Sequence, residues 1–412
     1  MIENEELSSG TTHRGCPVVH LNTSGDSPFG ERAAKLNALR EAAPIYWNEH
    51  NQCWVLTRAQ LLREVFQNPT VFTNDSISPG DPNPPYTWIP SNVGAPEHVQ
   101  YRQILNYAFG PAPVARIEPK ARDYCRMAID AVVDSGGCDF VAEVGGVFPT
   151  RVFLELIDLP WEDAPLFVTW TETIFNGFFS SPAALRATDE VKDYFVELIA
   201  ERRAAPRDPE HDFTSHLLRS QVNGHPIPDE DVLNVFNQLV LAGLDTVKSA
   251  LSYSLLHLAI NQDDRQRIVT EPAIIPLAIE EMLRAYPLVM EGRKLGSDIE
   301  FHGVPMRKGE MVMLLLPAAM RDPELFDRPD DIILDRPRNN HLAFGGGPHR
   351  CLGSHLARME MAVGLDEWHR RIPEYELGCP VGEIIERGGQ LSLRSLPLRW
   401  EVQPRRAAEQ WP

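Results

Sequence analysis

The 412-residue chain has little positive charge and no closely spaced pair of cysteines. Its formal net charge is −19, whereas nucleic-acid binding depends on clustered Lys and Arg that release counterions, so nucleic acid is not expected as a partner. The six cysteines form no CxxC motif, which argues against a zinc site and against a disulfide framework. Among them, Cys351 alone lies in an unusual local sequence.

Long uncharged apolar runs are also missing. No stretch reaches the roughly 18 to 20 residues that span a bilayer, and "MVMLLLPAAM" (311–320) is short and contains Pro317. The opening "MIENEELSSGTTHRG" is acidic and polar and lacks the basic-then-apolar pattern of a secretory signal. We therefore expect a cytoplasmic protein without a membrane segment, with a mobile tail over residues 1–28 and a C-terminal tail over residues 403–412.

The chain is rich in helical patterns and poor in strands. Helical periodicity dominates residues 97–135, 148–204 and 229–286, while extended runs occur near residues 45–58 and after Pro287. Regular alternation of strands and helices is absent, which argues against a doubly wound sheet. We expect one domain over residues 29–402, mainly α with a small β region.

The stretch "FGGGPHRCLG" (344–353) surrounds Cys351 with three consecutive glycines, a proline and two basic residues. Consecutive glycines allow a close approach of the backbone, so we expect this loop to lie flat against another surface, and a planar ligand would fit there. An apolar stripe at helical spacing predicts a helix that begins at about Cys351. Its predicted polar face comprises Arg358, Glu360, Asp366, Glu367, Arg370 and Arg371.

The predicted helix start bears on the chemistry of the Cys351 thiol. The positive end of the helix dipole, together with His349 and Arg350, is expected to lower the pKa of the thiol and to favour a thiolate that binds metal. The alternative is a buried structural cysteine beside a glycine loop. The glycine run combined with the helix start favours the ligand.

Residues 229–261 predict one long helix that is apolar on almost every face and therefore buried. Within it lies Asp245, and burial of an unpaired carboxylate is costly. In one interpretation Asp245 pairs with Lys248 or another cation, and Thr246 bonds to a carbonyl one turn earlier. In the other, the helix opens at Gly243 against a ligand, and Asp245 and Thr246 pass protons.

With these features the chain resembles the cytochrome P450 family of haem-thiolate monooxygenases from about residue 29 to residue 400. "LAGLDTV" (241–247) is similar to the family's oxygen-activation motif A/G-G-x-D/E-T, and "EEMLR" (280–284) is similar to its E-x-x-R pair. The haem-binding pattern F-x-x-G-x-H/R-x-C-x-G is matched by Phe344, Gly347, His349, Cys351 and Gly353.

The resemblance implies haem b, iron protoporphyrin IX, sandwiched between the long central helix and the helix of the cysteine loop. Cys351 would be the iron ligand, and Gly243, Asp245 and Thr246 would form the catalytic side above the haem. Cations are expected at the two haem propionates, and the matching positions are His98, Arg102, Arg293 and His349.

A structural charge cluster is also implied. Glu281 and Arg284 match the E-x-x-R pair, and a third member should come from "LDRPRNN", which offers Arg336 first and Arg338 second. We prefer Arg336. Outside the family context, Glu281 and Arg284 would count as an ordinary surface helix pair.

The branch that the chain resembles most is the bacterial camphor-hydroxylase-like one, in which a tyrosine of the proline-rich loop can bond to the substrate; here that is Tyr86. Further pocket candidates by position are Trp88, Leu239, Leu244, Val247, Val289, Met290 and Gln390. Lys248, bulky Met290 and polar Gln390 depart from that branch. These departures bear on the identity of the substrate, not on the chemistry.

The implied reaction is the insertion of one oxygen atom from O₂ into a small hydrophobic molecule, such as a terpenoid, by a monomeric enzyme. Two electrons would come from an iron-sulfur ferredoxin with its NAD(P)H-dependent reductase. The expected landing patch comprises Arg102, Lys120, Arg122, Arg350 and Arg358. The alternatives are a haem-thiolate peroxygenase or isomerase, and a haem-based ligand sensor without turnover.

Overall fold

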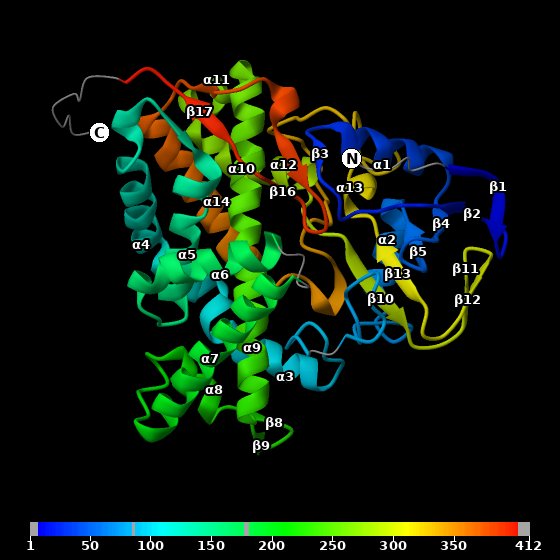
Figure 1. Ribbon diagram of the computed structural model, residues 1–412, viewed down its shortest axis with the longest axis horizontal. Coiled ribbons are helices and arrows are strands. Elements are labelled where there is room, and N and C mark those ends of the chain that lie inside the picture. The colour runs from blue at the N-terminus through cyan, green and yellow to red at the C-terminus, as the bar shows by residue number, and fades with distance from the viewer. Residues whose placement is uncertain (1–6, 85–86, 177–180, 403–412) are drawn as a thin grey trace.

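The computed structural model describes residues 7–84, 87–176 and 181–402, and it has a helical side and a strand-rich side (Figure 1). The helices are α1 (Glu31–Ala42), α2 (Ala59–Gln67), α3 (Glu97–Phe109), α4 (Pro111–Asp130), α5 (Val147–Leu156), α6 (Ala164–Asn176), α7 (Pro182–Ala204), α8 (Phe213–Arg219), α9 (Asp229–Gly243), α10 (Asp245–Ile260), α11 (Gln262–Thr270), α12 (Ile275–Ala285), α13 (Leu316–Ala319) and α14 (Ser354–Arg371). Helices thus dominate, and the prediction of a mainly α fold with a small β region is confirmed.

The strands form one larger sheet and several small ones. They are β1 (Leu7–His13), β2 (Cys16–Val19), β3 (Ser27–Pro28), β4 (Ile45–Asn48), β5 (Cys53–Leu56), β6 (Phe72–Thr73), β7 (Gly137–Asp139), β8 (Gln221–Val222), β9 (His225–Pro226), β10 (Glu291–Leu295), β11 (Ile299–Phe301), β12 (Val304–Met306), β13 (Met311–Leu314), β14 (Glu376–Leu377), β15 (Ile385–Arg387), β16 (Ser392–Leu393) and β17 (Pro397–Arg399). The larger sheet has the order β1-β2-β4-β5-β13-β10-β6. Its strand β10 carries Glu291 and Arg293, which share one face because side chains alternate along a strand.

The prediction of a mobile tail over residues 1–28 is wrong for residues 7–28. This segment contributes β1 and β2 to the larger sheet and β3 to a small sheet with β15 and β16. Val18, Val19 and Leu21 are nearly inaccessible, with exposed fractions of 3%, 2% and 2%. Burial of these apolar side chains holds the segment on the protein. Residues 403–412 lie outside the described residues.

The long central helix is interrupted once. α9 ends at Gly243, α10 begins at Asp245, and Leu244 between them leaves the regular helix. The two helices still follow one line through the middle of the molecule (Figure 1). Residues 229–260 are long and apolar enough to cross a membrane by length and composition, but 78% of the most apolar window is buried inside the protein, as in a core helix.

Helix α14 packs against α4 and also contacts α10 and α12. It begins at Ser354 with Gly353 as its N-cap residue, so Cys351 precedes the helix instead of starting it. The predicted polar face is wrong for Glu360 and Glu367, each of which is 1% exposed. Glu367 is buried against α4 because Arg122 and Arg126 of α4 neutralise it, at 3.1 and 2.9 Å.

Candidate haem-thiolate site

The glycine run of the cysteine loop is pressed against the end of α2. A Cβ atom at Gly347 would lie 2.0 Å from the carbonyl oxygen of Phe66, and one at Gly346 would lie 3.2 Å from the Phe66 side chain. Gly345 and Gly347 also have positive φ angles, 67° and 64°. The close approach predicted for this loop therefore exists, but the surface that requires it is the protein's own Phe66.

The loop closes on itself beside Cys351. The N–H of Cys351 donates to the carbonyl oxygen of Phe344 at 2.8 Å, and the Phe344 ring lies under the guanidinium group of Arg358 at 4.5 Å. Arg358 is held in turn by Glu280 of α12, with a distance of 2.6 Å between Nε and Oε1. The loop is thus tied to α12 and α14 on either side of the thiol.

The Cys351 side chain is exposed on the wall of a cavity of about 420 Å³. Protein atoms around the sulfur raise the pKa of the thiol by desolvation, whereas the N–H of Gly353 and the guanidinium group of Arg102 act to lower it. The prediction of a lowered pKa is therefore wrong for the thiol by itself. A metal ion deprotonates a coordinating thiol outright, so the raised pKa does not prevent ligation.

Four predicted cofactor ligands from three distant segments converge next to this loop. His98 and Arg102 lie one turn apart on α3, Arg293 lies on β10, and His349 lies in the cysteine loop. The rings of His98 and His349 have centroids 3.8 Å apart. Arg293 bonds to Glu291 at 2.8 Å, whereas no contact within the described part of the chain supplies an anion to Arg102.

The electrostatics of this cluster are unfavourable for cations. Burial, followed by the charge of Arg102, lowers the pKa of His98 to about 4. Burial, followed by His98, Arg293 and Arg102, lowers the pKa of His349 to about 3. The Nδ1 atom of His349 is also buried without a partner within the described residues. A ligand with carboxylate groups would supply the missing acceptors, and this is the fit expected for haem propionates.

The acid and the alcohol of the predicted proton pair lie at the start of α10, where each bonds to other groups. Lys248 Nζ lies 2.5 Å from Oδ1 of Asp245, and Gln390 Nε2 donates to Oδ2 at 2.9 Å. The Thr246 hydroxyl donates to the carbonyl oxygen of Ala242 at 3.0 Å. The first interpretation of this segment expected Asp245 to pair with Lys248 and Thr246 to bond to a carbonyl one turn earlier, and both bonds are present. These bonds do not exclude a role of the two residues in proton transfer.

Gly243 lies beside an aromatic ring of α5. A Cβ atom at this position would lie 3.0 Å from Cδ2 and Cε2 of Phe153. The helix does break here, at Leu244, as the second interpretation expected. A side chain at Gly243 would therefore require the Phe153 ring to shift.

The predicted pocket residues fall into two groups. Apolar members from the central helix are buried, and so is one from the segment before β10; they are Leu239, Leu244, Val247 and Met290. Partly exposed members are Trp88, Val289 and Gln390. Tyr86 lies outside the described residues.

Glu281, Arg284 and Arg336 meet in the interior, each less than a tenth exposed. Arg284 reaches both oxygens of Glu281 at 2.8 Å, and Arg336 reaches them at 2.9 to 3.1 Å. Burial acts to raise the pKa of Glu281, but the two arginines outweigh it and leave the pKa lowered. The structure therefore selects Arg336, since Arg338 is exposed.

Sequence reasoning missed a buried acid on α14. Glu360 is 1% exposed, and both of its carboxylate oxygens lack a partner within the described residues. Burial raises the pKa of Glu360 well above the ordinary value, which favours the neutral form of the carboxyl group. The alternation of charges along the helix concealed it, because Glu360 stands in the sequence between Arg358 and Asp366, which are only half-buried.

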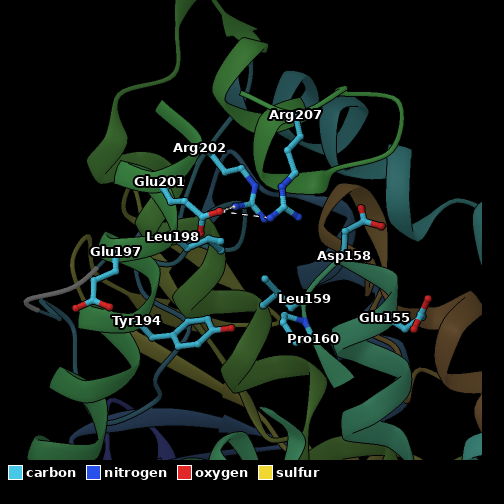
Figure 2. A pocket seen from close by; sticks show the side chains of 10 residues that line it. All are labelled: Glu155, Asp158, Leu159, Pro160, Tyr194, Glu197, Leu198, Glu201, Arg202 and Arg207. Carbon is cyan, nitrogen blue, oxygen red and sulfur yellow. Dashed lines mark hydrogen bonds and ion pairs between the residues drawn. The ribbon is translucent and has the colours of Figure 1, made fainter. Parts of the chain in front are cut away.

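A second cavity, of about 500 Å³, lies away from Cys351, between the end of α5 and α7. Figure 2 shows dashed lines from the Glu201 carboxylate to the guanidinium groups of Arg202 and Arg207, to which it bonds at 2.6 and 3.3 Å. The lining of this second cavity includes none of the residues discussed above. The internal ion pairs account for its charged lining.

The geometry can now be compared with known proteins. A sequence model described as "Cytochrome P450" matches residues 178–368. The chain is 31% identical over 382 residues to the probable cytochrome P450 127A1 of Sinorhizobium fredii, covering 91% of both chains. The chain belongs to the cytochrome P450 family. It is also 30% identical to a steroid C26-monooxygenase of Mycolicibacterium smegmatis, covering 82% of this chain and 85% of that protein.

Solved structures of P450 enzymes share the fold. The crystal structure of CYP101J2 superposes with a TM-score of 0.83 at 30% identity and covers 93% of this chain and 97% of the other. The structure of the bottromycin biosynthetic protein SalCYP gives 0.79 at 26% identity, covering 89% and 92%. The protein is thus a P450 monooxygenase that uses haem b with a thiolate ligand, and Cys351 lies at the matching motif position.

Proposed function

We propose that this P450 hydroxylates a small hydrophobic molecule, a terpenoid or a similar alicyclic compound, at an unactivated C–H bond. The electrons would come from an iron-sulfur ferredoxin and its NAD(P)H-dependent reductase, and the enzyme would act as a cytoplasmic monomer. Residues 29–402 would form the catalytic domain, with β1 and β2 packed onto it. P450 enzymes in general use O₂, redox partners and hydrophobic substrates.

The observation that carries the proposal is the position of the Thr246 hydroxyl. Asp245 and Val247 on either side of it are buried, at 4% and 4% exposed, whereas Thr246 is only partly buried at the break in the central helix. A hydroxyl group in that place can hold and pass a proton next to a dry, apolar surface. A hydroxylase needs this combination, because oxygen activation consumes protons while bulk water must be kept out.

The residues of the chain have separate tasks in this reaction. Haem, when bound, supplies the oxygen and electron chemistry, and a cysteine thiolate favours O–O cleavage. Cys351 would hold the iron, and His98, Arg102, Arg293 and His349 would hold the propionates. Asp245 would take a proton from water and pass it to Thr246, whose own hydroxyl proton moves on toward the oxygen substrate.

Apolar side chains support a hydrocarbon substrate. Leu244 and Val247 flank the two polar residues of the relay, and both are less than 5% exposed. Such walls bind alicyclic compounds by burial of apolar area and leave orientation to a few polar groups. The name of the similar steroid C26-monooxygenase supports an alicyclic substrate in a relative of this enzyme. Tyr86 remains the candidate for a hydrogen bond to a substrate oxygen.

The surface near Cys351 supports an acidic electron donor, on fewer residues than the sequence indicated. Lys120 bonds to Glu155, Arg122 to Asp366 and Arg358 to Glu280, so these three charges are largely neutralised within the protein. Arg102 and Arg350 line the 420 Å³ cavity together with Cys351. We place the docking site of the ferredoxin around Arg350, which is exposed.

A substrate screen tests the proposal directly. Small terpenoids, steroids and aromatic compounds are added to the haem-loaded enzyme, and the spectrum is followed for a shift toward the high-spin form. Terpenoids are expected to shift it, and ¹⁸O₂ should then label one oxygen of the product when reduced ferredoxin is supplied. Label from water or from added peroxide instead of O₂ would contradict the proposed reaction, and a shift with steroids alone would correct the substrate.

A further inference from the structure

Lys248 is a buried cation, and its ammonium group forms an ion pair with Asp245. It lies one turn after Asp245 on α10 and is 5% exposed. Its methylene chain passes Gly146, where an added Cβ would lie 3.6 Å from the Lys248 Cδ atom. A lysine in such a place is unusual, because an ammonium group loses its hydration on burial and needs an anion in return.

Gln390 reaches the same carboxylate from a distant segment. It lies between β15 and β16, and backbone bonds fix both of its neighbours: the N–H of Gly389 donates to Thr23 at 2.6 Å, and that of Leu391 donates to Leu288 at 2.8 Å. Strand β16 lies beside α10 (Figure 1). The amide group of Gln390 is therefore presented to Asp245 by a firmly held turn.

Together these contacts occupy both oxygens of Asp245. Lys248 holds Oδ1 and Gln390 holds Oδ2, with a weaker contact from the Ser249 hydroxyl at 3.4 Å. The Thr246 hydroxyl donates a hydrogen bond to the carbonyl oxygen of Ala242. In this arrangement, the described residues show no contact between the carboxylate of Asp245 and the hydroxyl of Thr246, the two groups of the relay.

We propose that Lys248 and Gln390 are positioning residues that set the charge and the direction of the Asp245 carboxylate. This inference rests on the relay role given to Asp245 and Thr246 in the proposed function. Lys248 stabilises the carboxylate as an anion that can accept a proton from water. Gln390 fixes the second oxygen and thereby the direction of the group.

The charge argument gives the direction of each effect. Without Lys248, the buried carboxylate loses its counter-ion, and an unpaired anion is unfavourable there. The relay then lacks the partner that holds one oxygen of its acid. Without Gln390 the ion pair remains and only the direction of one oxygen is lost, so the effect should be smaller.

The experiment compares Lys248→Met, Lys248→Arg, Gln390→Leu and Asp245→Asn in the haem-loaded enzyme with a substrate from the screen. The readouts are the share of electrons that ends in hydrogen peroxide and the solvent deuterium isotope effect on reductant consumption. Lys248→Met should lower product per electron by about tenfold, which is a part of the roughly 10²- to 10⁴-fold that positioned proton transfer contributes. Gln390→Leu should lower it roughly threefold.

A conservative variant and a matched control separate positioning from packing. Lys248→Arg keeps the charge and should recover most of the coupling and the isotope effect. Ser252→Ala removes a buried hydroxyl one turn further on, which donates to the Lys248 carbonyl oxygen at 2.7 Å, and should leave both readouts unchanged. The thermal midpoint gives a readout independent of turnover: Lys248→Met should lower it, and adding Asp245→Asn should restore most of the loss.

The outcomes distinguish this inference from the function on which it rests. If Asp245→Asn leaves the peroxide share and the isotope effect unchanged, the relay itself is wrong. If Asp245→Asn changes them while Lys248→Met and Gln390→Leu do not, the relay stands and the positioning role is overturned. A lower midpoint in Lys248→Met without any change in coupling would reduce Lys248 to a structural partner.

Discussion

Two buried carboxylates, Glu281 and Asp245, have similar burial and different surroundings. Glu281 accepts from two arginines and additionally from the N–H of Ile333 and the amide of Asn339. Asp245 accepts from one lysine, one glutamine amide and a distant hydroxyl. Arginine presents a rigid planar fork, whereas lysine ends in a point charge on a flexible chain. The first carboxylate is locked in place, and the second has fewer and more flexible partners.

The locked carboxylate should have the larger effect on stability. Glu281→Ala leaves Arg284 and Arg336 buried without an anion, which costs about 3 to 5 kcal/mol. We expect little folded haem protein, as measured by haem content and by urea unfolding. Normal haem binding and an unchanged unfolding midpoint would show that the cluster does not hold the cysteine loop.

The next largest effect should distinguish two neighbouring arginines. Arg336→Ala removes the fork that reaches both oxygens of Glu281 and should lower the free energy of unfolding by about 3 kcal/mol. Arg338→Ala changes an exposed side chain and should stay within about 0.5 kcal/mol. Equal effects in urea unfolding would mean that the cluster does not depend on its geometry.

A substitution next to Asp245 should change the share of electrons that ends in product more than it changes the stability of the protein. Thr246→Ala removes a hydroxyl that bonds within its own helix, so the free energy of unfolding should change by less than about 1 kcal/mol. The variant should still consume reductant but release several times more hydrogen peroxide, which a peroxide assay measures against NAD(P)H consumption. Unchanged coupling would remove Thr246 from the relay.

The smallest effect concerns Glu280, the sequence neighbour of Glu281. Burial acts to raise its pKa, but hydrogen bonds from Arg358 and His341 lower it to about 2. Because the folded-state pKa is below the ordinary 4.5, this stabilisation is complete above pH 4.5 and is lost as the pH falls toward 2. Glu280→Gln should remove about 1 kcal/mol at pH 7 and flatten this acid dependence, as measured by unfolding at pH 3 and pH 7.

Short motifs, together with the resemblance to the cytochrome P450 family, were sufficient for most of the site. The Cys351 loop and the break in the central helix depend on residues close together in the chain, and periodicity reports such features. The structural role of Glu281 with Arg284 came from the resemblance, because spacing alone indicated an ordinary surface pair.

Contacts between distant segments account for what the sequence did not predict. The role of Phe66 against Gly347, the bond from Gln390 to Asp245 and the burial of Glu360 depend on which elements meet in space. The same holds for Val18 and Val19, whose strand pairs with β4 from a later part of the chain. The sequence also does not show which surface charges are free: Lys120 and Arg122 were expected in the landing patch but form ion pairs in the fold.

The contact between Phe66 and Gly347 has a consequence for how the protein is made. The carbonyl oxygen of Phe66 shapes the loop that carries Cys351, although the two segments are synthesised far apart in time. During translation α2 is synthesised long before the loop that carries Cys351. The haem ligand therefore cannot be placed until nearly the whole chain has left the ribosome. A fragment that retained Cys351 but lacked α2 would carry the ligand without the surface that positions it.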